Sequence, residues 1–187
     1  MLSVALALLA CGPASATEVS GVALPDRIQV DRGGPQLTLN GAGVRVILMF
    51  KMYVAALYLP VRSDNGEAIL RAHQASRLRI QLLHDITVGE FKSAITGVLR
   101  ETLTAAQELP LESRLQALDA IFATQQTLKK GTIFSMDYAP GAGTTVRMDG
   151  LVKGRISGAD FNEALLRIWI GDRPRDPELR NALLGIR

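Results

Sequence analysis

Residues 44–60 read VRVILMFKMYVAALYLP, and this stretch decides the fold. It is dense in β-branched and aromatic side chains, which favour a strand over a helix, and a proline ends it. We therefore predict one long central strand here. Side chains at alternate positions of a strand share a face, so Arg45, Lys51 and Tyr53 are expected to project together from one side, among apolar neighbours.

Charged groups among apolar side chains on a buried strand are costly unless they find a partner. Two explanations remain open for the cations of this stretch. In the first, the charged ends are solvated and only their apolar stems pack against the protein. In the second, the strand borders an apolar cleft between sheet and helices, and the cations at its polar end receive an anionic head group.

The segments before the central stretch predict further strands. Residues 19–30 alternate apolar and polar positions around a proline, which is typical of a short edge strand. Residues 37–43, LTLNGAG, predict a strand that ends in a glycine-rich bend, with Gly41-Ala42-Gly43 as the turn.

Two amphipathic helices are expected after the central stretch. Thr87-Val88-Gly89-Glu90 is a capping box, in which the threonine hydroxyl and the glutamate carboxylate each satisfy a backbone amide of the first turn. Apolar residues then recur at helical spacing from Phe91 to Thr102. A second helix is expected to begin at Pro110 and to be closed by Lys129-Lys130-Gly131.

The last third of the chain predicts a meander of strands and then two helices. Strand-like runs over 132–138, 144–148 and 151–156 are separated by turn sequences, of which Asp149-Gly150 is a strong hairpin signal. Asp160 is expected to cap one helix, and Asp176-Pro177 to begin the last one. The order of elements indicates an α+β domain, an antiparallel sheet with helices packed on one face.

Residues 1–16, MLSVALALLACGPASA, have the layout of a secretory signal peptide: an uncharged apolar run, a Gly-Pro break and a small-x-small site. We expect cleavage after Ala16, a domain over residues 17–187 and a periplasmic location. Lipidation of Cys11 as a lipoprotein is the weaker alternative, because Leu9 is bulkier than that position usually accepts. The apolar run is too short to span a bilayer, so no stable membrane span is expected.

Composition and motifs exclude several classes of function. Lys and Arg exceed Asp and Glu by 21 to 18 over 187 residues, an excess too small and too dispersed to predict a nucleic-acid partner. His73 and His84 have no acidic or cysteine partner at ligand spacing, so no metal site is expected. Nucleotide-binding motifs and nucleophile elbows are absent from the sequence, and we expect no cofactor.

Two segments, LNGAGVR over 39–45 and FKMYVAALYLP over 50–60, resemble the chalcone isomerase-like family of exported bacterial proteins. Later segments agree with the same family and spread the resemblance over nearly all of the mature chain: 130–131, 137–144, 150–154, 160–161 and 168–171. The resemblance implies the chalcone isomerase fold, an open-faced β-sandwich in which a long antiparallel sheet is covered by helices.

The same resemblance suggests which residues form a site. Plant chalcone isomerases close a flavanone ring with an Arg after a glycine-rich turn, a Thr on the next strand, a Tyr near a helix start and an Asn seven residues later. By this resemblance Arg45 matches the Arg, Tyr53 falls at the Thr, Phe91 at the Tyr and Val98 at the Asn. The pocket implied here keeps its cation and loses most of its polar network.

We therefore expect an exported, non-catalytic protein that binds a fatty acid or similar amphipathic acid, as non-catalytic plant relatives of this fold do. Arg45 would anchor the anion beside Tyr53, with Lys51, Phe91 and Val98 completing the site. One alternative is an isomerase, an intramolecular lyase with Arg45 and Tyr53 as catalytic candidates. The other is a periplasmic protein-interaction domain, in which Arg45 is a core charge paired with Asp137 or Asp149.

Overall fold

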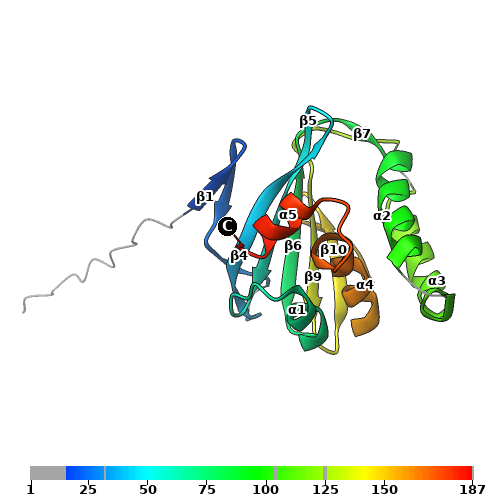
Figure 1. Cartoon of the computed structure of the whole chain (residues 1–187). Coiled ribbons are helices and arrows are strands. Elements are labelled where there is room, and N and C mark those ends of the chain that lie inside the picture. The colour runs from blue at the N-terminus through cyan, green and yellow to red at the C-terminus, as the bar shows by residue number, and fades with distance from the viewer. Residues whose placement is uncertain (1–15, 32, 103–104, 124–125, 187) are drawn as a thin grey trace, which may run out of the picture.

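The computed structural model describes residues 16–31, 33–102, 105–123 and 126–186. Within these residues, an antiparallel sheet of seven strands runs in the order β11-β10-β9-β6-β5-β4-β3 (Figure 1). The expected antiparallel sheet covered by helices is thus confirmed. The leader expected over residues 1–16, including Cys11, lies outside the described residues except for Ala16.

The strands are β1 Ala16–Val19, β2 Val22–Pro25, β3 Arg27–Gln29, β4 Gln36–Ile47, β5 Phe50–Leu59, β6 Ser76–Leu82, β7 Ile86–Thr87, β8 Thr127–Leu128, β9 Ile133–Ala139, β10 Gly143–Met148 and β11 Leu151–Ile156. The helices are α1 Gly66–Ala72, α2 Val88–Thr102, α3 Ala105–Ile121, α4 Ala159–Ile170 and α5 Pro177–Leu183. β1 pairs with β2, and β7 with β8, in two separate two-stranded antiparallel sheets.

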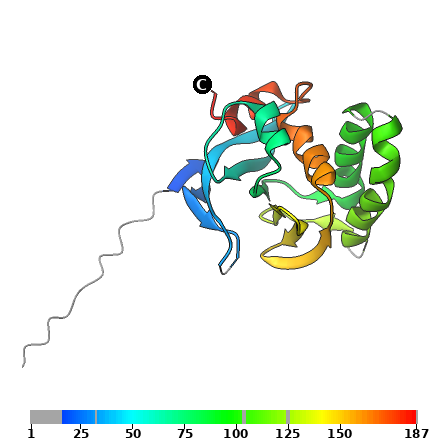
Figure 2. The same ribbon diagram turned by 90° about the horizontal axis from the view of Figure 1, so that it is seen from below.

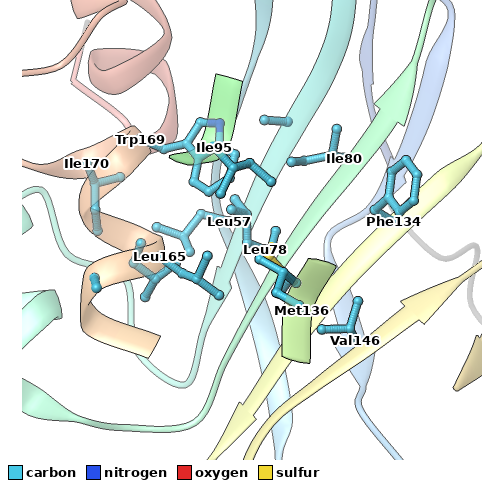
Figure 3. Packing of buried hydrophobic residues seen from close by; sticks show 14 of the residues in the cluster. Leu57, Leu78, Ile80, Ile95, Phe134, Met136, Val146, Leu165, Trp169 and Ile170 are labelled. Atoms are coloured by element: carbon cyan, nitrogen blue, oxygen red, sulfur yellow. The ribbon is translucent and has the colours of Figure 1, made fainter. Parts of the chain in front are cut away.

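The two faces of the main sheet are covered differently. Every helix described contributes buried side chains to the core cluster on one face. In Figure 3, Leu57 and Leu78 from the strands lie opposite Leu165 and Ile170 from α4. On the other face a smaller cluster is built from strands alone, including the β1–β2 hairpin. Figure 2 shows that hairpin on the opposite side of the molecule from α2 and α3.

The prediction of one long strand over residues 44–60 is wrong, because the chain reverses in its middle. β4 ends at Ile47 and β5 begins at Phe50, so the two strands form a hairpin with Leu48 and Met49 at its tip. Leu48 adopts the left-handed backbone region, with φ of 57°. Hairpin turns of this kind normally carry glycine or asparagine, and their absence here removed the signal that would have predicted the turn.

The hairpin changes how the residues of this stretch relate to one another. Arg45 lies directly opposite Tyr53 on the paired strand, so the two still share a face of the sheet. The register then shifts between Arg45 and Val46, and Lys51 pairs with Val46. Lys51 is exposed near the hairpin tip, and the argument that placed it beside Arg45 on a single strand does not hold.

The expected bend at Gly41-Ala42-Gly43 is also wrong, since β4 continues through these residues, with a register shift between Leu39 and Gly41 in its pairing with β5. α5 lies across β4 at this point. A Cβ atom on Gly41 would overlap the carbonyl oxygen of Ala182, and one on Gly43 would lie 2.7 Å from the Ala182 Cβ. The two glycines therefore provide the space in which α5 packs against the strand.

α1 and β6 were not predicted, and neither were the two-residue strands β7 and β8. β6 alternates strictly, with Leu78, Ile80 and Leu82 buried and the residues between them half-buried, a pattern that is typical of a strand with one face in the core. α1 is capped by Asn65, whose side chain accepts from the amide of Ala68 at 3.0 Å. Both signals are present in the sequence.

The helix starts are partly as predicted. The capping box is confirmed, since the Thr87 amide donates to the Glu90 carboxylate at 2.8 Å and the Glu90 amide donates to the Thr87 hydroxyl at 3.1 Å. The cap at Asp176 is confirmed by a 2.9 Å bond from the Leu179 amide. Two starts are corrected: α3 begins at Ala105 rather than at Pro110, and Gly158 rather than Asp160 precedes α4.

None of the helices in the described part of the chain is both long and apolar enough to cross a membrane.

Candidate functional site

A cavity of about 370 Å³ lies between the inner face of the sheet, α2, α4 and the loop that leads into α5. Its wall is mostly apolar, and α2 contributes the largest share. The apolar lining residues are Ile47, Met52, Ile80, Ile86, Phe91, Ala94, Ile95, Val98, Ile168 and Leu179. The volume is at the lower end of the range of small-molecule sites, about 300–1,000 Å³.

Arg45 lies at one end of this cavity and is held by an acidic partner. Its Nη1 atom lies 2.8 Å from Oδ2 of Asp176 and donates to the backbone oxygen of Arg175 at 3.3 Å. Both side chains of the ion pair are about four-fifths buried, with 21% and 17% exposed. Within the described residues, the bonds found to Arg45 use this one nitrogen, so Nη2 and Nε can still donate to a ligand.

The expected pairing of Arg45 with Asp137 or Asp149 is wrong, because both acids serve other groups. Asp137 lies on the other face of the sheet, where it accepts from Arg77 at 2.7 Å and from Arg147 at 3.0 Å. Asp149 accepts from the amide of Ile133 at the turn between β10 and β11. The cap of α5 supplies the partner of Arg45 instead.

Tyr53 lines the same end of the cavity and accepts a 3.0 Å hydrogen bond from Nε1 of Trp169 on α4. Burial raises the pKa of its phenol, and the Trp169 bond and the charge of Arg45 only partly offset that rise. The phenol is therefore neutral at physiological pH. Its proton can be donated to an acceptor in the cavity.

Phe91 and Val98 lie in the wall formed by α2. Phe91 stacks on Phe134 of the sheet, with ring centroids 5.1 Å apart, and meets the edge of Phe122 at 5.0 Å. Val98 is buried two turns further along the same helix. At both positions the wall is apolar, and neither side chain has a group that could move a proton.

Lys51 is set apart from the other predicted site residues. The structure brings Arg45, Tyr53, Phe91 and Val98 together around one cavity, whereas Lys51 is exposed on β5 and does not line it.

Exposed residues mark where the cavity opens. Ile47, Asp85, Glu90 and Arg175 line it and are exposed, and they lie near the β4–β5 turn, the start of α2 and the loop before α5. Asp85 accepts from Nζ of Lys129 at 2.9 Å and from the Lys130 amide, and these bonds lower the pKa of its carboxyl. The capping bonds from Thr87 lower the pKa of Glu90. Both carboxylates therefore stay charged at neutral pH.

Sequence analysis missed the partners of Arg45 and Tyr53 in the site. Asp176 was recognised only as a helix cap, and Trp169 as part of the segment 168–171 that carries the family resemblance. Neither local pattern indicates a contact with β4 or β5, because the contact depends on how α4 and α5 cross the sheet. The glycine pair at 41 and 43 was the available signal for a closely packed neighbour.

The histidines have other roles among the described residues, where no cluster of His, Cys, Asp or Glu is arranged to hold a metal ion. His73 lies 3.2 Å from the carboxylate of Glu163. His84 packs against the edge of the Phe50 ring, with centroids 5.8 Å apart.

Comparison with known proteins places the fold. The family model described as chalcone isomerase-like matches residues 16–185. The crystal structure of a fatty-acid binding protein from Arabidopsis thaliana superposes with a TM-score of 0.70, covering 89% of this chain and 93% of that chain at 15% identity. No curated protein sequence matches the chain significantly. At 15% identity the structural likeness concerns the fold alone.

Proposed function

The chain belongs to the chalcone isomerase-like family, and from that premise we propose that it binds a fatty acid or similar amphipathic acid without converting it. The observation that carries the proposal is one apolar cavity with a cation and a neutral phenol at the same end. We propose further that the protein works after export to the periplasm, to which the sequence of residues 1–16 would direct it.

The apolar wall supplies most of the binding energy in this account. Each methylene group moved from water into such a wall contributes about 0.8 kcal/mol. An acyl chain of several carbons lying along α2, beside Phe91 and Val98, would thus be held mainly by burial. The wall has few polar groups that could distinguish one acyl chain from another, so we expect selection by length rather than by substituents.

The polar end fixes the orientation of the acid. Nη2 and Nε of Arg45 present the paired donors that suit a carboxylate. The Tyr53 hydroxyl faces the same end and can donate its proton as a third bond. The negative charge of Asp176 beside them repels the carboxylate of the ligand. The affinity of the site therefore reflects a balance between attraction by Arg45 and repulsion by Asp176.

The apolar residues at Phe91 and Val98 favour binding over the isomerase alternative. General acid–base catalysis needs positioned donors and acceptors, each contributing about 10²- to 10⁴-fold in rate. Here Tyr53, which supplies the phenol in the described lining of the cavity, has a raised pKa and is bonded to Trp169. If the protein is instead a protein-interaction domain, the cavity needs no ligand. A ligand titration therefore distinguishes this alternative from the binding function.

The test is a titration of the purified protein with palmitate, in which the fluorescence of Trp169 reports binding. Trp169 is the chain's one tryptophan and lines the cavity. Arg45→Ala should weaken binding about tenfold to 100-fold, because it removes charge-assisted bonds of about 1.5–3 kcal/mol. Arg71→Ala is the matched control, since that arginine is 77% exposed on α1. Equal affinity in the Arg45 variant, or no binding by the wild type, would overturn the proposal.

A further inference from the structure

Exposed apolar side chains gather at one end of the main sheet. Among the described residues, nine large hydrophobic side chains are exposed, and seven of them lie at or beside two turns: Val46–Phe50 at the β4–β5 turn, and Leu151–Val152 directly after the turn between β10 and β11. Exposed apolar residues scattered singly are ordinary, whereas a gathering of them marks an interaction surface.

Backbone pairing places both turns at the same end. The Leu83 amide bonds to the carbonyl of Met52, the Gly131 amide to that of Leu82, and the Asp149 amide to that of Ile133. These bonds connect neighbouring strands in sequence from the β4–β5 turn to the β10–β11 turn. Figure 1 shows the β4–β5 turn at the top of the molecule, near β7 and the start of α2.

The end of the β4–β5 hairpin, residues 46–50, which comprises the turn and the strand residues beside it, is from here on called the tip. Leu48 and Met49 are 91% and 89% exposed, so their side chains contact little of the protein. Leu48 holds a left-handed conformation that is unfavourable for a leucine. Packing within the protein therefore does not explain why these positions are apolar, and a narrow protruding tip fits insertion into a soft surface better than docking on a flat one.

Lysines surround the apolar residues of this end. Lys51 adjoins the tip, Lys129 and Lys130 lie in the loop before β9, and Lys153 follows the second turn; all four are exposed. Three carboxylates accompany them: Asp85 is paired with Lys129, Glu90 is bonded within its helix cap, and Asp149 accepts from the Ile133 amide. Apolar side chains with flanking lysines are the combination that binds the interface of a phospholipid bilayer, where anionic head groups add to the attraction.

The tip also adjoins the opening of the cavity. Ile47 within the tip and Met52 just after it line the cavity, and the exposed lining residues Asp85 and Glu90 lie at the same end. A bilayer that received the tip would therefore meet the opening. An amphipathic acid could then pass between the membrane and the cavity with little exposure of its chain to water.

We propose that the tip inserts into the surface of a phospholipid bilayer and that the cavity exchanges its ligand with the membrane there. The membrane docking is inferred from the exposed apolar side chains of the tip alone. Only the exchange of ligand rests on the proposed function.

The test is flotation of the full chain with phosphatidylcholine vesicles, with and without phosphatidylglycerol. The double substitution Leu48→Ser and Met49→Ser should lower the vesicle-bound fraction at least tenfold, since it removes the apolar side chains that insert. Val61→Ser is the matched control: this valine is 72% exposed but follows the other end of β5, and its substitution should leave binding unchanged.

Two further measurements keep docking separate from ligand binding. The tip double variant should bind palmitate in solution as the wild type does, and Arg45→Ala should still float with vesicles. Failure of the wild type to bind vesicles, or equal flotation of the double variant, would overturn the proposal. Sedimentation of the wild type as a dimer that the double variant abolishes, without vesicle binding, would assign the tip to a second copy of the chain and also overturn it.

Discussion

Arg45 and Asp176 form the pair on which the chemistry of the cavity depends. Asp176 serves two groups at once, because one carboxylate oxygen caps α5 at the Leu179 amide and the other holds Arg45. An asparagine retains the capping oxygen but not the negative charge. The two roles of this residue can therefore be separated by one substitution.

Asp176→Asn should raise the affinity for palmitate several-fold, on the order of 1 kcal/mol, because it removes a charge that repels the ligand carboxylate. The cap should survive, whereas breaking an ion pair that is about four-fifths buried should cost the fold up to about 3–5 kcal/mol. A competition titration against a fluorescent fatty acid measures the change. Unchanged or weaker binding by a well-folded variant would show that Arg45 does not act as the anion anchor.

Tyr53 predicts a specific response to alkaline pH. Its folded-state pKa is raised, chiefly by burial, so the folded protein keeps the phenolic proton more tightly than the unfolded chain does. The stabilising contribution is fully present below the ordinary value of 10.0 and is lost as pH rises from there through the folded-state pKa. The unfolding free energy of the wild type should therefore fall above pH 10, and Tyr53→Phe should lack the part of that fall which is due to Tyr53.

Urea unfolding of wild type and Tyr53→Phe at a series of alkaline pH values checks this sign. Tyr58, whose pKa burial also raises, stays in both proteins and contributes equally. Identical pH dependence in the two proteins would mean that Tyr53 is more accessible to water than its position beside Trp169 implies.

At the scale of elements, α5 can pack closely against β4 because two residues of that strand, Gly41 and Gly43, have no side chain. The Ala182 carbonyl of α5 occupies the space where a Cβ on Gly41 would lie. Because Asp176 caps the same helix, the fit at Gly41 also positions the partner of Arg45. The glycine pair therefore connects helix packing with the cavity.

Gly41→Ala should destabilise the fold by about 1–3 kcal/mol, the usual cost of overpacking, and should also weaken palmitate binding by moving α5. Gly89→Ala in α2 is the control, since the nearest atom to an added Cβ there is 3.9 Å away and alanine favours a helix. Denaturant midpoints for both variants decide the point. Similar midpoints for the two would show that α5 can shift without cost.

The elements that sequence analysis predicted well are those with local signals. The box at Thr87–Glu90 and the cap at Asp176 depend on contacts within one helical turn, and both were found. The turn at Leu48–Met49 has no such signal, so the hairpin was taken as one strand. The partners of Arg45 and Tyr53 come from α5 and α4, more than a hundred residues away in sequence, and only the assembled fold brings them together.

At the scale of the whole molecule, the two faces of the main sheet differ in what covers them. The strand-only cluster and the β1–β2 hairpin cover one face of the sheet, and the helices leave a cavity on the other. The cavity opens toward the end of the sheet where the exposed apolar turns gather. The same antiparallel architecture thus positions the anion anchor in the wall of the cavity and the apolar tip near its opening.

The central claim, that the cavity holds an amphipathic acid anchored by Arg45, is tested most directly by native mass spectrometry with solvent extraction of protein purified from a periplasm. The wild type is predicted to carry an acyl compound that the Arg45→Ala protein, purified beside it, lacks. A wild-type protein that is empty, or a bound compound that both proteins retain equally, would contradict the account.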